Sequence, residues 1–371
     1  MADYPVTPHT PALSEQEIIR RQKLQSLIDA GQNPYAVTHF DVTHHSKEIT
    51  DNFESLEGKT VSLAGRMVSR RVMGKASFAH LLDAQGEMQI YVTRDDLGED
   101  AYAAFKKDDL GDIIGVSGTV FCTKTGEASI HVKSLTLLCK SLKVLPEKFH
   151  GLVDTDLRYR QRYVDCIVNP EVRDTFRKRS RIIAAVREFL DGRGYLEVDT
   201  PVLHTLEIGA SARPFRTFHN ALGIPMFLRI ETELYLKRLI VGGFERVYEV
   251  GRIFRNEGMD ATHNPEFTSV ETYQAYADYN EIMEMVEQLY EFVALKTLGT
   301  TDVTYQGQVI HLKAPWKRIT MADSVKEACG EDWTTWQSDE EARAICDKRN
   351  VHVEKDATKG CLLYTSPSPR D

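Results

Sequence analysis

The stretch FERVYEVGRIFRNEGMDATHNPEFTSVETYQAY, residues 244–276, decides the fold of this chain. Two runs of alternating residues flank a polar loop that is interrupted by Gly258 and Pro265. Alternation with a period of two is typical of pleated strands, so we expect a hairpin here. On one face the second strand carries a ring, a hydroxyl, a carboxylate and a phenol: Phe267, Ser269, Glu271 and Tyr273. This mixture is unusual for a purely structural strand and indicates a site.

Length and composition predict a soluble protein of two domains. The chain has 371 residues, of which 42% are hydrophobic and 27% charged, and its net charge is -9. One core seldom spans so many residues. No apolar run is long enough to cross a bilayer, and residues 1–17 lack the basic and apolar regions of an export signal. We therefore expect a cytoplasmic protein without a membrane partner.

Cysteine spacing and net charge narrow the function classes further. Six cysteines are scattered without C-x-x-C spacing, which favours reduced thiols over a disulfide framework or a zinc site. The acidic balance argues against binding nucleic acid over the whole surface. It averages over local patches, however, so an RNA site on one domain is compatible with it.

Residues 1–58 are predicted to form an N-terminal tail and a helix. Ser14 followed by Glu17 is a capping-box pattern, and it predicts a helix from Ser14 to Ala30. An apolar stripe is expected on one side of that helix: Ile18, Ile19, Leu24, Leu27 and Ile28. Basic residues such as Arg20 and Lys23 lie among them, and we interpret them as a solvated face in preference to an RNA contact.

Residues 59–140 are predicted to form an OB-fold barrel. Five short strand signals lie between Lys59 and Leu138, with a helical insert from Ala101 to Lys107 before the fourth strand. Five strands with one helix between the third and the fourth are the layout of that barrel. Arg71, Phe78 and Gln89 stand out because a guanidinium, a ring and an amide can stack on and hydrogen-bond unpaired bases. Ordinary barrel core is the competing interpretation of Phe78.

A basic linker, residues 141–168, separates the barrel from a second domain, residues 169–371. Asn169-Pro170-Glu171 predicts the start of a long helix with an apolar stripe, followed by a strand at residues 195–198. A small-residue loop at 203–213, a short helix near Glu233 and a helix over 280–298 frame the hairpin. The last residues, 362–371, are expected to be an unstructured end.

The hairpin loop gathers residues suited to a nucleotide. Arg255 has the planar fork that stabilises charge on an α-phosphate, and Glu257 suits an adenine amino group or a metal. His263 and Asn264 suit phosphate oxygens, and Phe267 suits stacking on a purine. Singly, each has an ordinary explanation, such as a surface ion pair or core packing. Five such residues on one hairpin favour the nucleotide site.

Two carboxylates, Glu233 at a helix start and Glu271 on the hairpin, are far apart in sequence but able to meet. A buried carboxylate pair favours a cationic ligand, because unpaired negative charges in a low dielectric are costly. Compensation of the helix dipole is the competing explanation of Glu233. Walker A, G-x-G-x-x-G and H-E-x-x-H patterns do not occur, so P-loop, Rossmann and zincin sites lack support.

Three stretches resemble a known family. GRIFRNEGMDATHNPEFTSVETYQAYADY resembles motif 2 of the class II aminoacyl-tRNA synthetases, and its H-N-P-E-F-T and E-x-Y details resemble the lysyl-tRNA synthetases. FRKRSRIIAAVREFLDGRGYLEVDTPVL resembles motif 1, and AGRMVSRRVMGKASF is similar to that family's OB anticodon-binding domain. Motif 1 covers about residues 176–203 and motif 2 about 244–276. The resemblance implies an α+β fold with an antiparallel catalytic sheet, a homodimer built partly on motif 1, and ATP with Mg²⁺.

The resemblance also implies a role for each matching residue. Arg255 would contact the α-phosphate, and four residues would hold the rest of ATP: Glu257, His263, Asn264 and Phe267. L-lysine would be held by Gly209, Ala210, Glu233, Glu271 and Tyr273. The anticodon of tRNA(Lys) would be read by Arg71, Phe78 and Gln89. The implied reaction forms lysyl-adenylate and pyrophosphate and then transfers the lysyl group to the tRNA 3′ end.

The sequence departs from the family pattern in two places. Ile208-Gly209 stands where two adjacent glycines are usual, which is expected to narrow the amino acid loop. The family's third motif, a Gly-rich strand and helix with an ATP-binding arginine, does not occur. We therefore expect a chain truncated before motif 3, with no magnesium ligands of its own and little or no ligation activity.

Two other functions stay open on the sequence. An aspartyl- or asparaginyl-type synthetase shares the barrel and both motifs, but an acidic amino acid would need cations where Glu233 and Glu271 stand. A non-catalytic tRNA-binding fragment would bind tRNA through a folded OB domain, and its incomplete catalytic half would be unstable or would serve as a partner.

Overall fold

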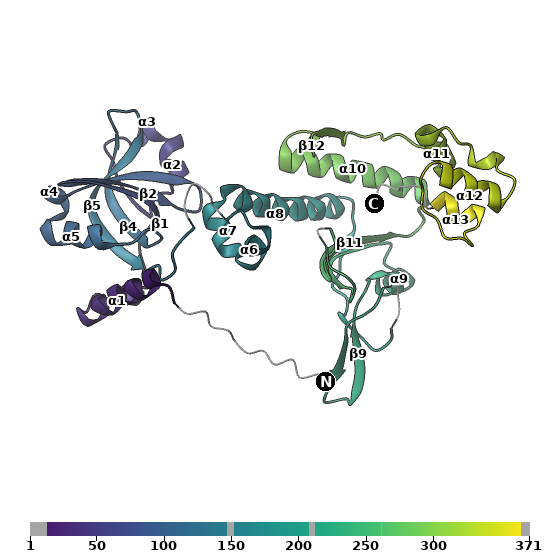
Figure 1. Ribbon diagram of the computed structural model, residues 1–371, viewed down its shortest axis with the longest axis horizontal. Coiled ribbons are helices and arrows are strands. Elements are labelled where there is room, and N and C mark those ends of the chain that lie inside the picture. The colour runs from purple at the N-terminus through teal and green to yellow at the C-terminus, as the bar shows by residue number, and fades with distance from the viewer. Residues whose placement is uncertain (1–12, 147–151, 208–211, 261, 365–371) are drawn as a thin grey trace. The chain divides into compact units, whose positions relative to one another are not determined.

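The computed structural model describes residues 13–146, 152–207, 212–260 and 262–364 (Figure 1). Its contacts divide the chain into two compact units, one up to Arg173 and one from Asp174 onward. No helix among the described residues is long and apolar enough to cross a membrane.

The first unit is built on a closed five-stranded barrel in the order β1-β2-β3-β5-β4. Its strands are β1 (Thr60–Met73), β2 (Ala76–Leu82), β3 (Glu87–Thr93), β4 (Ile113–Cys122) and β5 (Ala128–Cys139). Strands β3 and β5 pair in parallel, and the other neighbours pair antiparallel. Buried and half-buried residues alternate along β2 and β3, so every second side chain fills the interior. The predicted OB barrel is confirmed.

The helical insert between β3 and β4 starts earlier than the sequence predicted. It consists of α4 (Arg94–Leu97) and α5 (Glu99–Lys107), separated by Gly98 with a φ of 88°. The Thr93 side chain accepts a hydrogen bond from the backbone of Asp96, a cap that fixes where α4 begins. From α5, Tyr102 and Phe105 are buried in the barrel core.

The N-terminal helix α1 (Glu15–Asp29) has the predicted capping box between Ser14 and Glu17. The predicted apolar stripe is wrong, because Ile18, Ile19 and Ile28 are 36–44% exposed. The helix is attached through its basic residues instead, so the interpretation of a solvated basic face is also wrong.

Two basic side chains make this attachment. Arg20 is 6% exposed, and its Nη1 donates to the carbonyl oxygens of Ser141 and Lys143 at 3.1 and 2.9 Å. Lys23 Nζ lies 2.6 Å from the Asp109 carboxylate. A helix can therefore bury a charged side when backbone carbonyls and carboxylates satisfy it.

Shorter helices complete the first unit: α2 (Ser46–Asp51), α3 (Phe53–Leu56), α6 (Thr155–Arg160) and α7 (Arg162–Val168). The last two lie in the stretch predicted as a linker. They are held by the buried carboxylate of Asp165, which accepts hydrogen bonds from Arg158 at 2.8 Å and Arg162 at 2.5 Å.

The second unit contains the predicted hairpin, β10 (Arg246–Phe254) and β11 (Glu266–Gln274), paired antiparallel over nine residues. Strand β6 (Leu196–Glu197) pairs in parallel with the start of β10. A second sheet has the order β7-β9-β8: β7 (Leu203–His204), β8 (Arg216–His219) and β9 (Ile224–Leu228). Helix α9 (Glu233–Val241) leads from this sheet to β10. The α+β class is confirmed.

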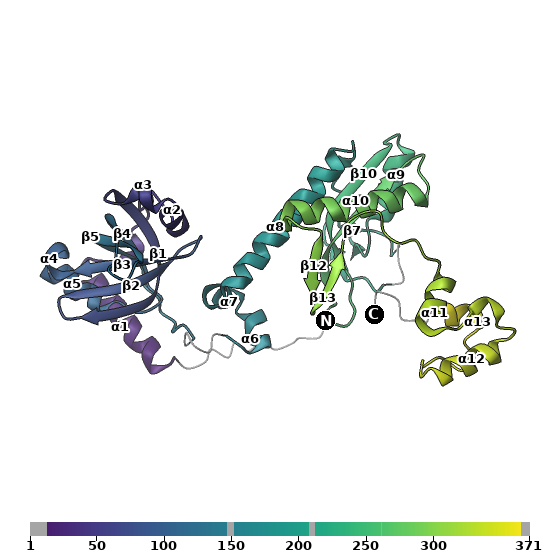
Figure 2. The same cartoon turned by 90° about the horizontal axis from the view of Figure 1, so that it is seen from above.

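Two long helices, α8 (Pro170–Asp191) and α10 (Tyr279–Leu298), contribute to one core with the hairpin (Figure 2). Tyr248 of β10 is fully buried there between Leu190 and Met285. Tyr248 and Val250, at even positions of β10, thus serve this core. The odd positions lie on the opposite face, which leaves that face for a site.

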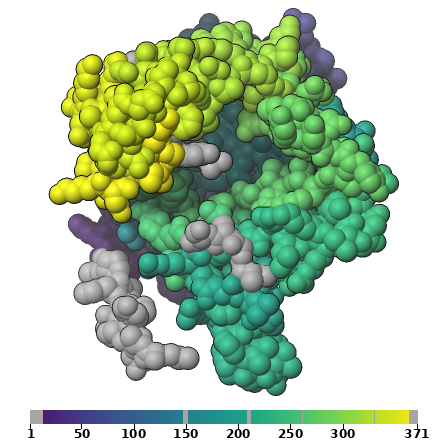
Figure 3. Space-filling model, turned by 90° about the vertical axis from the view of Figure 1, so that its right-hand side faces the viewer, coloured from purple at the N-terminus to yellow at the C-terminus, as the bar shows by residue number. Residues whose placement is uncertain are grey.

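After α10 the chain forms the hairpin β12 (Asp302–Tyr305) and β13 (Gln308–His311). Three helices follow, α11 (Met321–Cys329), α12 (Asp339–Lys348) and α13 (Lys359–Tyr364), shown in yellow tones in Figure 3. Leu362 is 3% exposed and belongs to their core with Trp336 and Cys346. The prediction of an unstructured end is wrong for residues 362–364, and residues 365–371 lie outside the described part.

Candidate functional site

The site face of the hairpin consists of the odd-numbered residues of its two strands. Glu249 pairs with Glu271, Gly251 with Ser269 and Ile253 with Phe267. The predicted row of Phe267, Ser269, Glu271 and Tyr273 on one face follows from this register. All four are half-buried, so a ligand that covers the face would complete their burial.

Arg255 follows the last residue of β10, and its backbone N–H donates to Pro265 O at 2.8 Å across the loop. Its guanidinium carbon lies 5.4 Å from the centre of the Phe267 ring. The Nε atom is buried and has no hydrogen-bond partner among the described residues. A cation held over a ring, with a buried donor unused, is suited to an anionic ligand beside a planar one.

The other predicted ATP residues lie on the exposed loop. Glu257 Oε1 accepts from the backbone N–H of Arg213 at 3.3 Å, which connects the loop to the segment before β8. His263 Nδ1 lies 2.8 Å from Asp260 Oδ2. Hydrogen bonds from the Thr262 backbone and from His263 hold the pKa of Asp260 well below its usual value. His263 and Asn264 are exposed, and the Arg255 guanidinium lies over Phe267, while the backbone N–H of Glu257 donates to Arg255 O at 2.9 Å.

Glu271 is the centre of the second part of the site. Its Oε1 accepts from the backbone N–H of Thr232 at 3.4 Å, and its Oε2 accepts from the Tyr273 hydroxyl at 3.2 Å. Burial, and then the charge of Glu271, raise the pKa of Tyr273, so this phenol keeps its proton and stays a donor.

Glu233 lies in the first turn of α9, directly after the Thr232 that contacts Glu271. Its side chain is 51% exposed and pairs with Lys237 one turn further along the helix. The link between the two predicted carboxylates is therefore indirect. The backbone N–H of Thr232 donates to Glu271, and Glu233 is the residue that follows Thr232 in the chain. Gly209 and Ala210, also predicted to bind the amino acid, lie outside the described residues, as does Ile208.

A third carboxylate, Glu231, belongs to the same place and was missed by the sequence analysis. It is 7% exposed, and its Oε2 accepts from the backbone N–H of Leu234 at 3.2 Å. Burial raises the pKa of Glu231, and the charges of Glu271 and Glu233 raise it further. The sequence signal that could have identified Glu231 is E-T-E, residues 231–233, at the predicted start of this helix.

A buried ion pair lies beside Glu271 on the same face. Arg229 Nη1 is 2.5 Å from Glu249 Oε1, both side chains are 3% exposed, and Thr200 Oγ1 donates to Glu249 Oε2 at 2.6 Å. We call these three residues the Arg229 network. A Cβ atom on Gly251 would lie 2.3 Å from Arg229 Nη2 and 2.9 Å from Glu249 Oε1, so a side chain here would require these two side chains to shift.

The outer face of the barrel carries a separate cavity of about 760 Å³. Arg71, Phe78 and Gln89, the three predicted base-contacting residues, all line it. The core interpretation of Phe78 is wrong, because its side chain is half-buried at this surface and lies opposite Tyr91 in the β2–β3 register. The structure thus brings together the residues that the sequence had placed on neighbouring strands.

Further residues of this cavity were not predicted. Gln89 Nε2 donates to Glu127 Oε2 at 2.7 Å, and its Oε1 accepts from Ser129 Oγ at 2.8 Å. The ring of Tyr91 lies 4.8 Å from that of Phe78 and 6.0 Å from that of Phe121. Only the barrel closure shows that β4 supplies a ring here.

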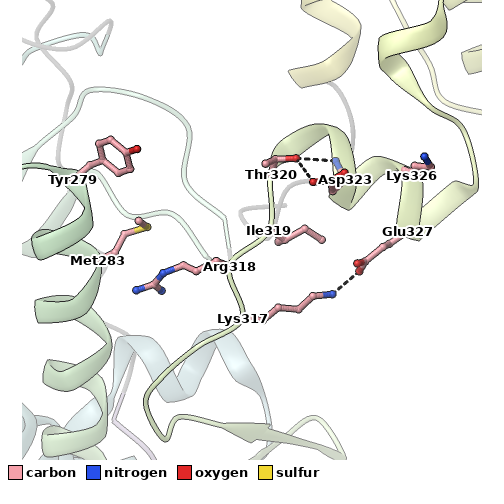
Figure 4. A pocket seen from close by; sticks show the side chains of 9 residues that line it. All are labelled: Tyr279, Met283, Lys317, Arg318, Ile319, Thr320, Asp323, Lys326 and Glu327. Carbon is pink, nitrogen blue, oxygen red and sulfur yellow. Dashed lines mark hydrogen bonds and ion pairs between the residues drawn. The ribbon is translucent and has the colours of Figure 1, made fainter.

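A third cavity, of about 730 Å³, lies between α10 and the start of α11 (Figure 4). Its cations already have partners, since Lys317 pairs with Glu327 at 2.6 Å and Arg318 with Glu287 at 3.0 Å. It contains none of the predicted site residues. Within the described ranges, no group of three or more His, Cys, Asp or Glu side chains is arranged to hold a metal ion.

Comparison with known proteins agrees with both parts of the fold. Residues 154–364 match the family model for tRNA synthetases class II (D, K and N), and residues 61–138 match that for the OB-fold nucleic acid binding domain. Among curated relatives, the lysine--tRNA ligase of Clostridium perfringens (strain SM101) is 57% identical over 95% of this chain and 71% of its own length. The lysine--tRNA ligase of Clostridium botulinum (strain Loch Maree) is 56% identical over 93% of this chain and 69% of its own length.

Proposed function

The chain belongs to the class II tRNA synthetases and, within them, to the lysine--tRNA ligases, and we propose that its residues form sites for L-lysine, ATP and tRNA(Lys) in the activation of lysine and its transfer to the tRNA. The observation that carries the proposal is the environment of Glu271. This half-buried carboxylate accepts from Tyr273 and Thr232 and lies next to the buried Glu231. An ammonium group provides the positive charge that such a place favours.

The amino acid is proposed to bind between β11 and the start of α9. Glu271, Tyr273 and Glu233 would hold it, and Gly209 and Ala210, which lie outside the described residues, stay predicted to bind it too. The acidic character of these side chains supports lysine over aspartate or asparagine, the other amino acids that the family description denotes by letter. An acidic ligand would lie against Glu231 and Glu271 at a high electrostatic cost.

ATP is proposed to bind along the hairpin loop. Phe267 would stack on the adenine, and the Arg255 guanidinium would contact the α-phosphate, with Glu257, His263 and Asn264 around the remaining groups. The lysine carboxylate would attack the α-phosphorus, and the bond to pyrophosphate would break. Arg255 then stabilises the charge that develops on the α-phosphate oxygens, so the protein acts by positioning and electrostatics.

The barrel cavity is proposed to bind the anticodon of tRNA(Lys). Phe78 supplies a ring for stacking, Arg71 a cation, and Gln89 an amide whose direction Glu127 and Ser129 fix. After activation, the ribose hydroxyl at the tRNA 3′ end would attack the lysyl carbonyl and release AMP.

Mg²⁺ is expected with ATP in this family, where it would neutralise phosphate charge. The described residues do not form a group that fits it, so no step is assigned to it.

A homodimer in the cytoplasm is proposed as the assembly and location. Phe176 and Ile182, on the motif 1 helix α8, are 49% and 41% exposed and offer apolar surface for a second copy. A cytoplasmic location fits an enzyme of translation.

Isothermal titration calorimetry with L-lysine, L-aspartate and L-asparagine tests the proposal. Lysine is expected to bind, and aspartate and asparagine are not. Tyr273→Phe should weaken lysine binding by about 1 kcal/mol, roughly fivefold in Kd, because Glu271 loses one donor. Tyr276→Phe, at a ring that is 91% exposed, is the matched control. Binding of an anticodon stem-loop without any binding of lysine would overturn the proposal and favour a tRNA-binding role alone.

A further inference from the structure

Glu231 is buried beside the proposed amino acid site although it is a carboxylate. Only 7% of its surface is exposed, and the hydrogen bond from Leu234 N–H at 3.2 Å places its Oε2 at the N-terminus of α9. The helix dipole offsets part of the cost of this burial. Burial raises the pKa of Glu231, and the charges of two further carboxylates, Glu271 and Glu233, raise it further.

One buried polar group beside Glu231 lacks a hydrogen-bond partner among the described residues. The Thr232 side chain is 3% exposed, and its hydroxyl has no hydrogen-bond partner among the described residues. The backbone N–H of the same residue reaches Glu271. Thr232 thus contacts the half-buried Glu271 and follows the buried Glu231 in the chain, and its hydroxyl offers an unused donor and acceptor that a polar ligand would satisfy.

The elements that surround Glu231 supply little positive charge to it. On α9, Lys237 pairs with the exposed Glu233. On β11, Glu271 and Tyr273 offer a carboxylate and a protonated phenol. On β10 and the segment before α9, the charge of Arg229 is taken up by Glu249. On β7, His204 packs on Tyr235 of α9, and burial lowers the pKa of this imidazole, which favours its neutral form.

We propose that Glu231 is a third carboxylate of the amino acid pocket and that binding of an ammonium group expels a proton from it into solvent. The inference rests on the proposed function, since it assumes that an amino acid with a side-chain ammonium binds at Glu271. In the empty pocket the proton neutralises one of three neighbouring carboxyls. When the ammonium arrives, its charge replaces that of the proton, and Glu231 ionises.

The proposal gives Glu231 a role in specificity. A neutral amino acid of the same length brings no charge, so it leaves the proton on Glu231 and gains no ion pair there. A lysine-like ligand gains the attraction of an additional carboxylate, and its affinity increases as the pH rises. Recognition of the positive charge on the ligand side chain is thereby coupled to release of the proton from Glu231.

Titration calorimetry tests this with the full chain and L-lysine at pH 5.5, in two buffers of different ionisation enthalpy. The wild type is expected to release a measurable fraction of a proton per lysine bound, and Glu231→Gln at most half of that. Glutamine keeps the size and the acceptor for Leu234 N–H but cannot ionise. Between pH 5.5 and 7.5 the wild-type affinity should increase several-fold, and that of the variant clearly less. Glu266→Gln, which removes a 53% exposed carboxylate of β11, should release as many protons as the wild type.

A second measurement needs no ligand and separates the role from folding. Because the pKa of Glu231 is raised in the folded state, ionisation of this side chain destabilises the folded protein once the pH exceeds the unfolded pKa of about 4.3. Glu231→Gln should therefore raise Tm more at pH 7.5 than at pH 5. Equal proton release by the wild type and Glu231→Gln would overturn the inference and leave lysine binding intact. Failure of the wild type to bind lysine at either pH would overturn the proposed function and the inference with it.

Discussion

Glu249 and Glu271 lie directly opposite each other in the β10–β11 register, and Glu249 has a buried counterion of its own, Arg229. Two adjacent carboxylates on one face repel each other unless a cation intervenes. Arg229 neutralises the deeper one. The charge that is left for a ligand is therefore that of Glu271 and its neighbours at α9.

Arg229→Met is expected to destabilise the second unit by about 3–5 kcal/mol, because Glu249 would remain buried without its partner. Urea unfolding measures this change. Adding Glu249→Gln to the same chain should recover a large part of the loss. Arg252→Met removes a cation that is 55% exposed and paired with Glu266, so it should cost less than about 1 kcal/mol. Equal losses for Arg229→Met and Arg252→Met would contradict the prediction.

Arg255→Ala is expected to weaken ATP binding at least about tenfold, in line with the roughly 1.5–3 kcal/mol of a hydrogen bond to a charged group. Lysine at this position should recover only part of the affinity, since its ammonium lacks the planar fork. Competition with a fluorescent ATP analogue gives the affinities. Arg252→Ala, on the opposite face of β10, serves as the control. Unchanged ATP affinity in Arg255→Ala would place the nucleotide elsewhere.

Phe78→Ala and Gln89→Ala should affect RNA binding in different ways. Loss of the ring removes stacking worth about 1–3 kcal/mol, so affinity for an anticodon stem-loop should fall for every anticodon sequence. Loss of the amide should instead reduce the preference for the tRNA(Lys) anticodon over a changed one. Gel-shift titrations with both stem-loops measure affinity and preference. Tyr163→Ala, at a ring that is 59% exposed away from the cavity, should alter neither.

Asp83→Asn should make the first unit less stable at neutral pH by about 2 kcal/mol. Burial alone would raise the pKa of Asp83, but hydrogen bonds from Ser46, Gln85 and Gly86 outweigh it and lower the pKa below its usual value. The stabilisation is thus present above the unfolded pKa of about 3.9 and is lost as the pH falls through the folded value. Urea unfolding at pH 7 and pH 3 should show a difference that shrinks at the lower pH. Asp95→Asn, at an 81% exposed carboxylate, should show no such trend.

Features that depend on local period were predictable from the sequence. The row from Phe267 to Tyr273 follows from the alternation of a strand, and the capping box at Ser14 follows from four residues. The barrel followed from the number of strands and the position of one helix. Each of these signals lies within a short window of the chain.

Features that depend on distant partners were not predictable. Arg20 is buried because carbonyls some 120 residues later accept from it, and Glu231 is buried by the elements around α9. Glu127 reaches Gln89 at the barrel cavity because β5, which it precedes, pairs with β3. A short stretch of sequence around each of these residues does not contain the partners that determine its burial and hydrogen bonds.

Gly251 constrains the order in which this pocket can change during evolution. A side chain there would displace the Arg229 guanidinium and the Glu249 carboxylate, whereas a shorter residue at position 229 would leave room for it. A lineage that changes both positions is therefore expected to alter position 229 before position 251. Reconstructed intermediates that take the two steps in the opposite order should be the less stable ones.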